Sequence, residues 1–398
     1  MSDDTAQAAA AAARESASGF GLDDYLAQDA EDKALGRFGL LGADTEAAAG
    51  ADDVPAGFDE ALCMRLYRGM LDIRLMDERF MTLQRQGRIG FYGEAKGQEA
   101  AVVGSAASLE PDDWLVPALR EAGAGLFRGL PLESYVSQLY GNAADVTKGR
   151  QMPCHPCDRD THYVVMSSCV ANQLPHAVGI AWGMKLQGHA GRMCIGYMGD
   201  GGTSEGDFHW AMELAARSQA PVVLVCQNNQ WAISTPGAMQ TAAETIALKG
   251  VGYGIESLRA DGNDVLACYA VSKYAADKAR AGGGPTFIEL LTYRVSAHTS
   301  SDDPSRYRDE SVTEVWKRER DPIHRMRAFM SARGWLADED DQRLRADIEA
   351  RVRAVVEAQE AISRPEVDTL FDDVYEQPTW LQREQRDYLR SQPRRRGH

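Results

Sequence analysis

Two short motifs with the residue types of a phosphate and metal site follow two apolar runs in the middle of the chain. A Gly-Asp-Gly-Gly stretch at 199–202 comes after the first run, and an Asn-Asn pair at 228–229 comes after the second. If the runs are parallel strands, their carboxyl ends open at the same edge of a sheet, where such sheets bind ligands. The side-chain oxygens of Asp200 and Asn229 can then meet around one hard divalent cation such as magnesium. The glycines let backbone N–H groups approach a phosphate closely.

The combination of the two motifs is more specific than either motif alone. A single Gly-Asp-Gly is common in tight turns. A dinucleotide site has the pattern Gly-x-Gly-x-x-Gly, but the third glycine here falls at Gly206, after Gly199 and Gly201. The pair of motifs, each after an apolar run, resembles the thiamine diphosphate motif, which begins Gly-Asp-Gly and ends Asn-Asn.

Alternating strand-like and helical segments predict the frame that positions these motifs. The strand-like runs lie at 192–198, 221–226 and 287–293. Between the first two, Phe208, Met212 and Ala215 recur on one helical face, which predicts a helix. Ser204 and Asp207 resemble the N-cap box of that helix. Strand, helix and strand in this order predict a parallel sheet with crossover helices, an α/β fold.

Composition and periodicity divide the chain into three segments. Residues 1–57 are rich in Ala, Asp and Gly and predict a low-complexity acidic arm that is loosely ordered. Residues 58–330 carry the motifs and predict an α/β domain that binds thiamine diphosphate, beginning with a helix whose apolar residues recur from Leu62 to Leu83. Residues 331–398 predict a C-terminal helical extension and tail.

Charge and composition argue against several classes of protein. The chain has 398 residues, is 44% hydrophobic and carries a formal net charge of -16. This acidity argues against nucleic acid and anionic membranes as partners, since both bind basic surfaces. The sequence has no apolar run long enough to span a membrane, and its N-terminus resembles neither a signal peptide nor a transit peptide. Because the seven cysteines lack a disulfide spacing, we expect a protein of the bacterial cytoplasm.

Six longer motifs resemble the alpha subunits of branched-chain 2-oxo acid dehydrogenases. They are Gly-Arg-Gln-Met-Pro at 149–153, Gly-Gly-Thr-Ser-Glu-Gly-Asp at 201–207, Asn-Asn-Gln-Trp-Ala-Ile-Ser-Thr at 228–235, Ala-Asp-Gly-Asn-Asp-Val at 260–265, Thr-Tyr-Arg at 292–294 and His-Thr-Ser-Ser-Asp-Asp-Pro-Ser-Arg-Tyr-Arg at 298–308. The resemblance implies the thiamine diphosphate-binding fold. It also implies an oxidoreductase of the 3-methyl-2-oxobutanoate dehydrogenase type, which decarboxylates a branched-chain 2-oxo acid and acylates the lipoyl group of an acyltransferase core.

Two features keep other functions open. Gly-Gln-Glu-Ala at 97–100 is a form associated with pyruvate dehydrogenase alpha subunits, and it favours a pyruvate or acetoin dehydrogenase. Leu119 stands where the family usually has an aromatic residue, and Gln227 stands where some members have arginine. The loss of both contacts to the diphosphate favours a non-catalytic homologue.

The resemblance implies that thiamine diphosphate and Mg²⁺ bind at the Gly-Asp-Gly and Asn-Asn motifs. The Mg²⁺ ligands are then the side chains of Asp200 and Asn229 and the backbone carbonyl of Trp231. The backbone N–H groups of Gly201 and Gly202 contact the diphosphate. Asp200, Asn229 and the two glycines belong to the two motifs at 199–202 and 228–229, and Trp231 follows two residues after the second motif.

Further contacts to the cofactor come from two other segments. By resemblance, the guanidinium of Arg120 holds the diphosphate, which suits the strong hydrogen bonds between guanidinium and phosphate. Ser168 and Val170 meet the aminopyrimidine ring. The same segment matches a potassium site made of a hydroxyl, a backbone carbonyl and two side-chain amides. These potassium ligands are Ser167, Cys169, Asn172 and Gln173, of which Cys169 and Asn172 depart from the family pattern.

His298 is the residue that the resemblance assigns to catalysis and to cofactor binding. It matches a loop histidine near the thiazolium ring and the diphosphate, where it can bind phosphate and assist acyl transfer. For His155 we expect structural packing. The resemblance also implies a separate beta subunit that supplies the glutamate which activates the aminopyrimidine. We therefore expect an alpha2-beta2 heterotetramer with active sites between chains, which acts on the lipoyl acyltransferase core.

Overall fold

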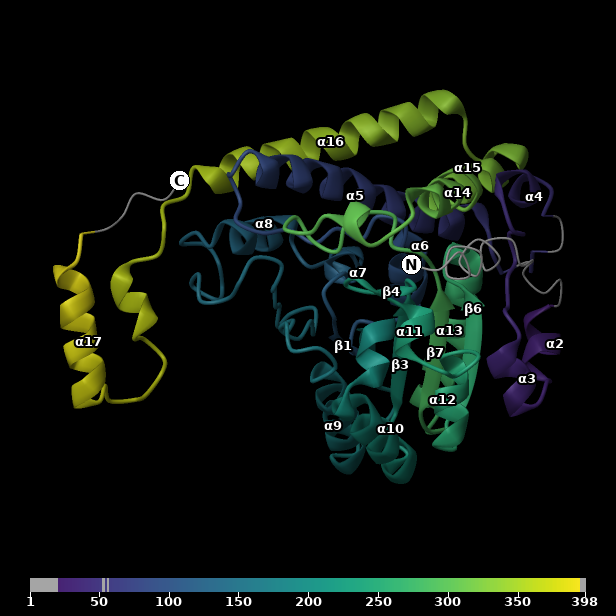
Figure 1. The fold of residues 1–398 in the computed structure, drawn as a ribbon, viewed down its shortest axis with the longest axis horizontal. Coiled ribbons are helices and arrows are strands. Elements are labelled where there is room, and N and C mark those ends of the chain that lie inside the picture. Colours follow the sequence, from purple (N-terminus) through teal and green to yellow (C-terminus); the bar gives the residue numbers. More distant parts are fainter. Residues whose placement is uncertain (1–20, 52–53, 56, 394–398) are drawn as a thin grey trace.

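A five-stranded parallel sheet forms the centre of the protein (Figure 1). The computed structural model describes residues 21–51, 54–55 and 57–393. In spatial order the strands are β1 (Trp114–Val116), β2 (Cys194–Gly199), β3 (Val222–Asn228), β7 (Thr286–Leu291) and β6 (Glu256–Asp261). The predicted parallel sheet is confirmed, and the three predicted strands correspond to β2, β3 and β7. The sequence did not indicate β1 and β6.

Helices cover both faces of this sheet, which explains why β3 is apolar along most of its length. Side chains of a strand alternate between faces, so Val222 and Leu224 pack into one core and Val223 and Val225 into another. The first core is closed by α9 (Gln173–Leu186) and α10 (Gly206–Ser218). The second core is closed by α5 (Glu60–Arg85), α6 (Glu99–Ala106), α7 (Ala122–Arg128), α8 (Leu132–Tyr140) and α13 (Val265–Arg280).

The predicted helices are present, but one predicted helix start is wrong. Asp59 caps α5, where its carboxylate accepts from the backbone N–H of Leu62 at 2.8 Å. The N-cap box expected at Ser204 and Asp207 does not form, because Ser204 lies in a separate 3-10 turn, η1 (Asp200–Ser204). Helix α10 begins at Gly206, after this turn. The turn keeps the backbone that follows β2 close to the end of the sheet.

Residues 21–51 differ from the expected loose arm. They form three short helices, α2 (Leu22–Leu26), α3 (Ala30–Leu35) and α4 (Thr45–Ala49). Phe38 pairs with the outer strand β6 through backbone hydrogen bonds of 3.0 and 2.9 Å. Asp264 accepts the backbone N–H groups of Leu40 and Leu41, each at 2.6 Å. This segment therefore covers the β6 edge, while residues 1–20 of the predicted arm lie outside the described residues.

Helices continue through the C-terminal part of the described chain. Helices α14 (Glu310–Glu319) and α15 (Pro322–Ala332) begin before residue 331, and the segment predicted as a helical extension contains α16 (Asp338–Glu360), η3 (Val367–Leu370) and α17 (Trp380–Ser391). Ile348, Val352 and Val356 of α16 are buried in the same core as α5. In contrast, α17 stands apart from the body (Figure 1), and Trp380 at its start is 69% exposed. The division of the chain at residues 57 and 330 stays a prediction. Near the sheet, a further helix, α12, spans Ala247–Gly252.

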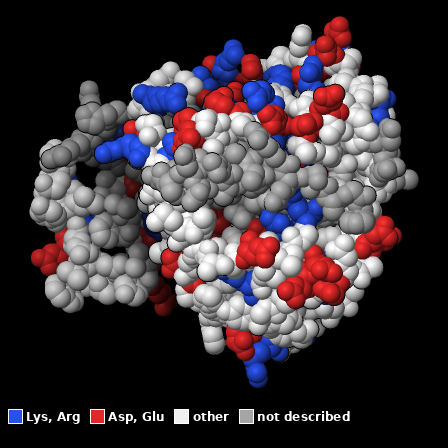
Figure 2. All heavy atoms as spheres, turned by 45° about the vertical axis from the view of Figure 1, so that its right-hand side comes forward, with Lys and Arg blue, Asp and Glu red and all other residues white. Residues whose placement is uncertain are grey.

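The surface carries charges of both signs. On the face shown in Figure 2, lysine and arginine side chains lie among aspartate and glutamate side chains along the upper rim. Over the described residues, no helix is both long enough and apolar enough to cross a lipid bilayer. On this face, acidic and basic side chains are thus interspersed, although the chain as a whole carries a net charge of -16.

Candidate active site

A cavity of about 520 Å³ lies at the carboxyl ends of β2 and β3. In the register of the sheet, Gly199 pairs with Gln227, so the residues that follow both strands lie at the same edge. The predicted site residues in the cavity wall are Arg120, Ser167, Ser168, Val170, Gln173, Asp200, Gly201, Gly202, Asn229, Trp231 and His298. The other two predicted residues, Cys169 and Asn172, lie in the same segment but outside the wall. The fold therefore brings the predicted groups together, while their roles stay predictions.

Asp200 offers a buried carboxylate oxygen that suits a cation. Its side chain is 1% exposed, and its Oδ2 atom has no hydrogen-bond partner among the residues that the structure describes. Burial raises the pKa of Asp200 to about 7. A buried carboxylate without a partner is costly, and a divalent cation at this place would satisfy it. The donor set thus fits the Mg²⁺ site expected from the sequence.

The two glycines after Asp200 leave space that a side chain would fill. A Cβ atom at Gly201 would lie 2.8 Å from Cβ of Ala232, and one at Gly202 would lie 3.3 Å from Cβ of Met198. Gln240 fixes this turn, because its Nε2 atom donates to the carbonyl of Asp200 at 2.5 Å. Bare backbone in the wall of a cavity is the arrangement by which glycine turns bind phosphate oxygens.

Asn229 is held in one orientation by its neighbours. Its Oδ1 atom accepts from the backbone N–H of Trp231 at 3.2 Å, and its Nδ2 atom donates to Oε1 of Gln98 at 3.0 Å. Trp231 belongs to β4 (Trp231–Ala232), which pairs with β5 (Thr235–Pro236) ahead of α11 (Gly237–Gln240). The oxygen of Asn229 and the carboxylate of Asp200 thus both belong to this edge of the sheet.

Arg120 connects two segments of the cavity wall. Its side chain is 8% exposed, and its guanidinium donates to the carbonyl of Glu94 and, at 2.8 Å, to the carbonyl of His298. Burial lowers its pKa from the ordinary value. This buried cation lies in the wall of the cavity, where it can attract a diphosphate.

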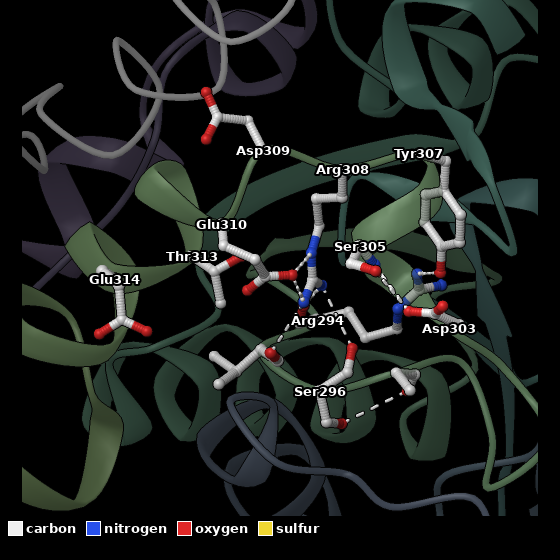
Figure 3. Close-up of polar contacts among 12 residues, drawn as sticks. Arg294, Ser296, Asp303, Ser305, Tyr307, Arg308, Asp309, Glu310, Thr313 and Glu314 are labelled. Atoms are coloured by element: carbon white, nitrogen blue, oxygen red, sulfur yellow. Dashed lines mark hydrogen bonds and ion pairs between the residues drawn. The ribbon is translucent and has the colours of Figure 1, made fainter.

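His298 lies in a loop that is held by a carboxylate. Oδ2 of Asp302 accepts from the backbone N–H of His298 at 2.7 Å and from the hydroxyl of Tyr307 at 2.5 Å. The Tyr307 oxygen in turn accepts from Nη2 of Arg294 at 2.6 Å (Figure 3). Burial, and then the positive charges of Arg120 and Arg294, lower the pKa of His298 to about 4. The imidazole is therefore neutral at physiological pH, able both to donate and to accept a proton.

Arg308 fastens the start of the same loop (Figure 3). Its guanidinium donates to three consecutive backbone carbonyls, those of Arg294 at 2.6 Å, Val295 at 3.1 Å and Ser296 at 3.2 Å. It also pairs with Glu310 at 2.9 Å. These contacts fix the path of the chain from β7 toward His298. The short helix η2 (Pro304–Arg306) lies between Arg294 and Arg308 in the sequence.

His155 contacts a predicted cofactor residue. Its Nε2 atom lies 2.7 Å from Oγ of Ser168, and its Nδ1 atom lies 3.0 Å from the carbonyl oxygen of Pro153. A carbonyl can only accept, so Nδ1 carries a proton, and in the neutral ring Nε2 accepts from Ser168. His155 is buried, as the packing prediction implies, and it also orients a hydroxyl in the cavity wall.

Glu121 and Gln98 are residues of the cavity wall to which the sequence assigned no role. Glu121 is buried, accepts from Nε2 of Gln227 at 2.6 Å, and has its pKa raised to about 7 by burial. Gln98 is fully buried beside Asn229. The Gly-Gln-Glu-Ala form at 97–100 drew attention to the segment that contains Gln98, but it did not indicate the contact between Gln98 and Asn229.

The predicted potassium ligands lie in the turn before α9 and at the first residue of that helix, Gln173. Oδ1 of Asn172 and Oε1 of Gln173 are buried and find no hydrogen-bond partner within the described ranges. Oγ of Ser167 accepts from the backbone N–H of Cys169 at 3.2 Å. Nowhere in the described chain do three or more His, Cys, Asp or Glu side chains group as a metal site. The candidate Mg²⁺ site therefore has a single carboxylate, that of Asp200, and the candidate potassium site has amide, hydroxyl and carbonyl oxygens.

Comparison with known proteins identifies the family. The family model described as "Dehydrogenase E1 component" matches residues 67–368. A 2-oxoisovalerate dehydrogenase subunit alpha 2 of Arabidopsis thaliana is 41% identical over 326 residues, which cover 82% of this chain and 69% of that protein. The corresponding alpha subunits of Caenorhabditis elegans and Homo sapiens are each 40% identical, over 83% and 82% of this chain and 77% and 74% of their own lengths.

These matches include β2, β3, the loop of His298 and the turns that hold the candidate ligands. They confirm the resemblance that the motifs indicated. The chain belongs to the dehydrogenase E1 component family.

Proposed function

We propose that this chain is the alpha subunit of a branched-chain 2-oxo acid dehydrogenase, which decarboxylates 2-oxoisovalerate and transfers the acyl group to a lipoyl group. The observation that carries the proposal is the buried carboxylate oxygen of Asp200, which has no partner among the described residues and shares one cavity wall with Asn229, Arg120 and His298. The names of the relatives support the choice of substrate, because those compared are 2-oxoisovalerate dehydrogenase alpha subunits.

The cofactor of this reaction would be thiamine diphosphate with Mg²⁺. When bound, thiamine diphosphate supplies the nucleophilic carbon that attacks the 2-oxo group and the electron sink that decarboxylation requires. Asp200, Asn229 and the backbone carbonyl of Trp231 would bind Mg²⁺, since all three present oxygen to a hard cation. The backbone N–H groups of Gly201 and Gly202 would donate to the diphosphate.

Arg120, Ser168 and Val170 would complete the cofactor site. The guanidinium of Arg120 would offset the negative charge of the diphosphate, which is favourable because the arginine is buried. The hydroxyl of Ser168 would donate its hydrogen bond to His155, which leaves the Ser168 oxygen free to accept from an amino group of the aminopyrimidine ring. Val170 would provide an apolar contact beside it.

His298 would bind a phosphate oxygen of the cofactor and would move a proton during acyl transfer. Its neutral imidazole can donate to a phosphate oxygen through one nitrogen and exchange a proton during acyl transfer through the other. Arg120 and Asp302 hold its backbone on both sides, at the carbonyl and at the N–H. A well-ordered loop would thus fix the position of the His298 imidazole relative to the reacting group.

A structural potassium ion would stabilise the turn before α9. Asn172 and Gln173 offer two buried oxygens, and Ser167 and the carbonyl of Cys169 would add two more. The replacement of the family residues at 169 and 172 leaves the oxygen donors of this set in place, because a backbone carbonyl serves for the first and an amide for the second. Its role would be to hold Ser168 and Val170 in position.

The active complex would contain a beta subunit. Met152, Val170 and Ile233 belong to the cavity wall and are 53%, 57% and 55% exposed, which is unusual for apolar side chains at a ligand site. A second chain that covers them would complete the cavity and supply the activating glutamate. We infer an alpha2-beta2 heterotetramer that acts on a lipoyl acyltransferase core, and we keep the bacterial cytoplasm as its expected location.

Two other functions are testable alternatives. A pyruvate or acetoin dehydrogenase is favoured by Gln98 of the Gly-Gln-Glu-Ala form, which lies in the cavity wall. A non-catalytic homologue is favoured by Leu119 and by Gln227, whose amide donates to Glu121. Against that homologue, Asp200 and His298 keep the chemistry that binding and acyl transfer require.

The test uses the chain co-expressed with its beta subunit. Titration calorimetry would measure the binding of thiamine diphosphate with Mg²⁺ to the wild-type complex and to Asp200→Ala. We expect binding that requires both chains and is lost in the variant. A panel of 2-oxo acids then compares kcat/KM for 2-oxoisovalerate with that for pyruvate. A well-folded wild-type complex that does not bind the cofactor would contradict the enzymatic function, and a preference for pyruvate would favour the second alternative.

A further inference from the structure

Gln98 is a fully buried side chain in the wall of the candidate active site. It is 0% exposed and immediately precedes α6, but its side chain makes no capping hydrogen bond to that helix. Its partner is instead Asn229, which lies 131 residues further along the chain. A buried amide that does not serve its own helix requires another explanation, since buried polar groups are normally satisfied.

The hydrogen bonds around Asn229 fix which end of the Gln98 amide faces which neighbour. The backbone N–H of Trp231 can only donate, so the Asn229 atom that it contacts is the oxygen, Oδ1. The other end of Asn229 is therefore Nδ2, a donor. Because Nδ2 of Asn229 donates, the Gln98 atom that lies 3.0 Å from it is the acceptor Oε1. The remaining end of Gln98 is consequently an amino group.

This amino group is an unused donor. Nε2 of Gln98 is buried and has no hydrogen-bond partner in the described part of the chain, although the residue lies in the cavity wall. A buried N–H donor without an acceptor is destabilising, so a ligand of this cavity is expected to supply the acceptor. The acceptor atoms that suit a donor at a metal and phosphate site are negatively charged oxygens.

We propose that Gln98 is a direct binding residue for the diphosphate of the cofactor, with Oε1 holding Asn229 and Nε2 donating to a phosphate oxygen. The inference rests on the proposed function, which places Mg²⁺ and a diphosphate beside Asn229. Its position supports the diphosphate, because the same short segment contacts Arg120 through the carbonyl of Glu94. Gln98 would thereby replace the contacts to the diphosphate that are lost at Leu119 and Gln227.

The contacts at the other two positions explain why a replacement is needed. Leu119 has no polar group, and Nε2 of Gln227 is engaged by the carboxylate of Glu121. In the arrangement seen here Leu119 therefore cannot donate to a phosphate, and Gln227 has only its second Nε2 hydrogen left to donate. Gln98 and Arg120 both carry N–H donors in the cavity wall, and Nε2 of Gln98 is buried there without a partner among the described residues.

Two substitutions of Gln98 separate binding of the anion from support of Asn229. Gln98→Glu keeps an oxygen for Nδ2 of Asn229 but replaces the donor with a negative charge. Gln98→Met keeps the approximate volume and removes both functions. If Nε2 donates to the diphosphate, Gln98→Glu is the more damaging change, with a Kd for thiamine diphosphate and Mg²⁺ raised at least about tenfold, or about 1.4 kcal/mol. Gln98→Met should lie between it and the wild type.

The measurement is titration calorimetry on the complex with the beta subunit, repeated with inorganic pyrophosphate and Mg²⁺ as a ligand without the rings. We expect the same ranking of affinities for both ligands. Gln359 provides the matched control, because its Oε1 atom also accepts from an asparagine, Asn142, at 3.1 Å, and neither residue belongs to the cavity wall. Gln359→Glu should leave both Kd values unchanged.

Three outcomes would overturn this role. A Gln98→Glu complex with the wild-type Kd, together with weak binding by Gln98→Met, would make Gln98 a support for Asn229 alone. Unchanged Kd values with a raised KM for the 2-oxo acid would assign the donor to the substrate carboxylate instead. If the wild-type complex itself binds neither ligand, the proposed function fails along with this inference. Thermal unfolding of each variant complex establishes that the compared proteins are folded.

Discussion

The hydroxyl of Tyr307 donates a 2.5 Å hydrogen bond to Oδ2 of Asp302, and the same carboxylate oxygen accepts the backbone N–H of His298 at 2.7 Å. Burial, and then the hydrogen bond to Asp302, raise the pKa of Tyr307 to about 12, so the phenol remains a donor throughout the physiological range. The position of His298 thus depends on a hydroxyl nine residues further along the loop.

Replacement of that hydroxyl tests the dependence. In Tyr307→Phe, Asp302 loses one of its two donors, and the His298 loop should become less ordered. We expect acyl transfer to the lipoyl group to fall on the order of tenfold to 100-fold, because small displacements of a catalytic group cost this much. The Kd for thiamine diphosphate should change much less, and both quantities are measured on the complex with the beta subunit.

A second tyrosine provides the control for that experiment. Tyr274 also donates to a carboxylate, Glu256, at 3.2 and 3.3 Å. Glu256 is the first residue of β6, and neither residue belongs to the cavity wall. Tyr274→Phe should therefore leave the rate of acyl transfer at the wild-type level. Equal losses in Tyr274→Phe and Tyr307→Phe would indicate a general effect of losing a hydroxyl and would refute the specific role of the loop.

The sequence was sufficient to predict the centre of the fold and the residues that gather around the cavity, while their roles stay predictions. The apolar runs that became β2 and β3 are buried on both faces, so their composition alone marks them as strands. Asp200 and Asn229 follow directly from those strands, and parallel pairing brings them to one edge. These predictions succeed because they need only local pattern and one rule of sheet geometry.

Other elements could not be predicted because their stability depends on distant contacts. Strand β6 carries Glu256, Arg259 and Asp261 and looks polar, yet Lys33 pairs with Glu256 at 2.6 Å and the carbonyl of Leu35 accepts from Arg259 at 3.0 Å. Both partners come from α3, which is only six residues long and therefore too short for a periodic signal.

The missed residues of the site have the same cause. Nothing local distinguishes Gln98 from any other glutamine near a helix start, and its partner is 131 positions away. His155 contacts Ser168, which lies 13 residues further along the chain. The segment between them is irregular and has no hydrophobic periodicity from which the contact could be predicted. The resemblance to a family identifies such positions only where the family assigns a role, so contacts particular to this chain had to come from the structure.

The titration of His298 predicts a proton uptake when the cofactor binds. Burial, Arg120 and Arg294 lower the pKa of His298 to about 4, below its ordinary value of 6.5. A bound diphosphate adds negative charge nearby and should raise this pKa. At pH 5, calorimetry in two buffers of different ionisation enthalpy should therefore report more proton uptake for the wild-type complex than for His298→Asn. Equal proton uptake in the two proteins would contradict a contact between His298 and the diphosphate.

Without the cofactor, the same shift predicts how stability depends on pH. Because the folded state holds the pKa of His298 at about 4 and the unfolded state at about 6.5, the unfolded chain binds more protons between these values. The free energy of unfolding should decrease as the pH falls through this window. His298→Asn removes the titrating group, so its midpoint of thermal unfolding should fall less between pH 6.5 and pH 4.5.

Glu121 predicts the opposite dependence at higher pH. Burial raises its pKa from 4.5 to about 7, so the folded state binds more protons between these values and the free energy of unfolding falls as the pH rises. Glu121→Gln keeps the shape without the charge, and it should stabilise the cofactor-free complex by up to roughly 3 kcal/mol at pH 8. The advantage should shrink toward pH 5, where Glu121 itself is largely neutral. A gain in the midpoint of unfolding that is equal at both pH values would contradict this assignment.

The two unpartnered oxygens before α9 predict a specific effect of potassium. Oδ1 of Asn172 and Oε1 of Gln173 have no hydrogen-bond partner in the ranges that the structure describes, so a bound cation should stabilise this turn. We expect the midpoint of thermal unfolding of the complex to be several degrees higher in potassium chloride than in tetramethylammonium chloride at equal ionic strength, since about 1 kcal/mol shifts it by a few degrees. Asn172→Leu should remove most of that difference, whereas Asn142→Leu, distant from the turn, should preserve it. A wild-type complex with the same midpoint in both salts would show that the oxygens of this turn do not hold potassium, whatever the family pattern implies.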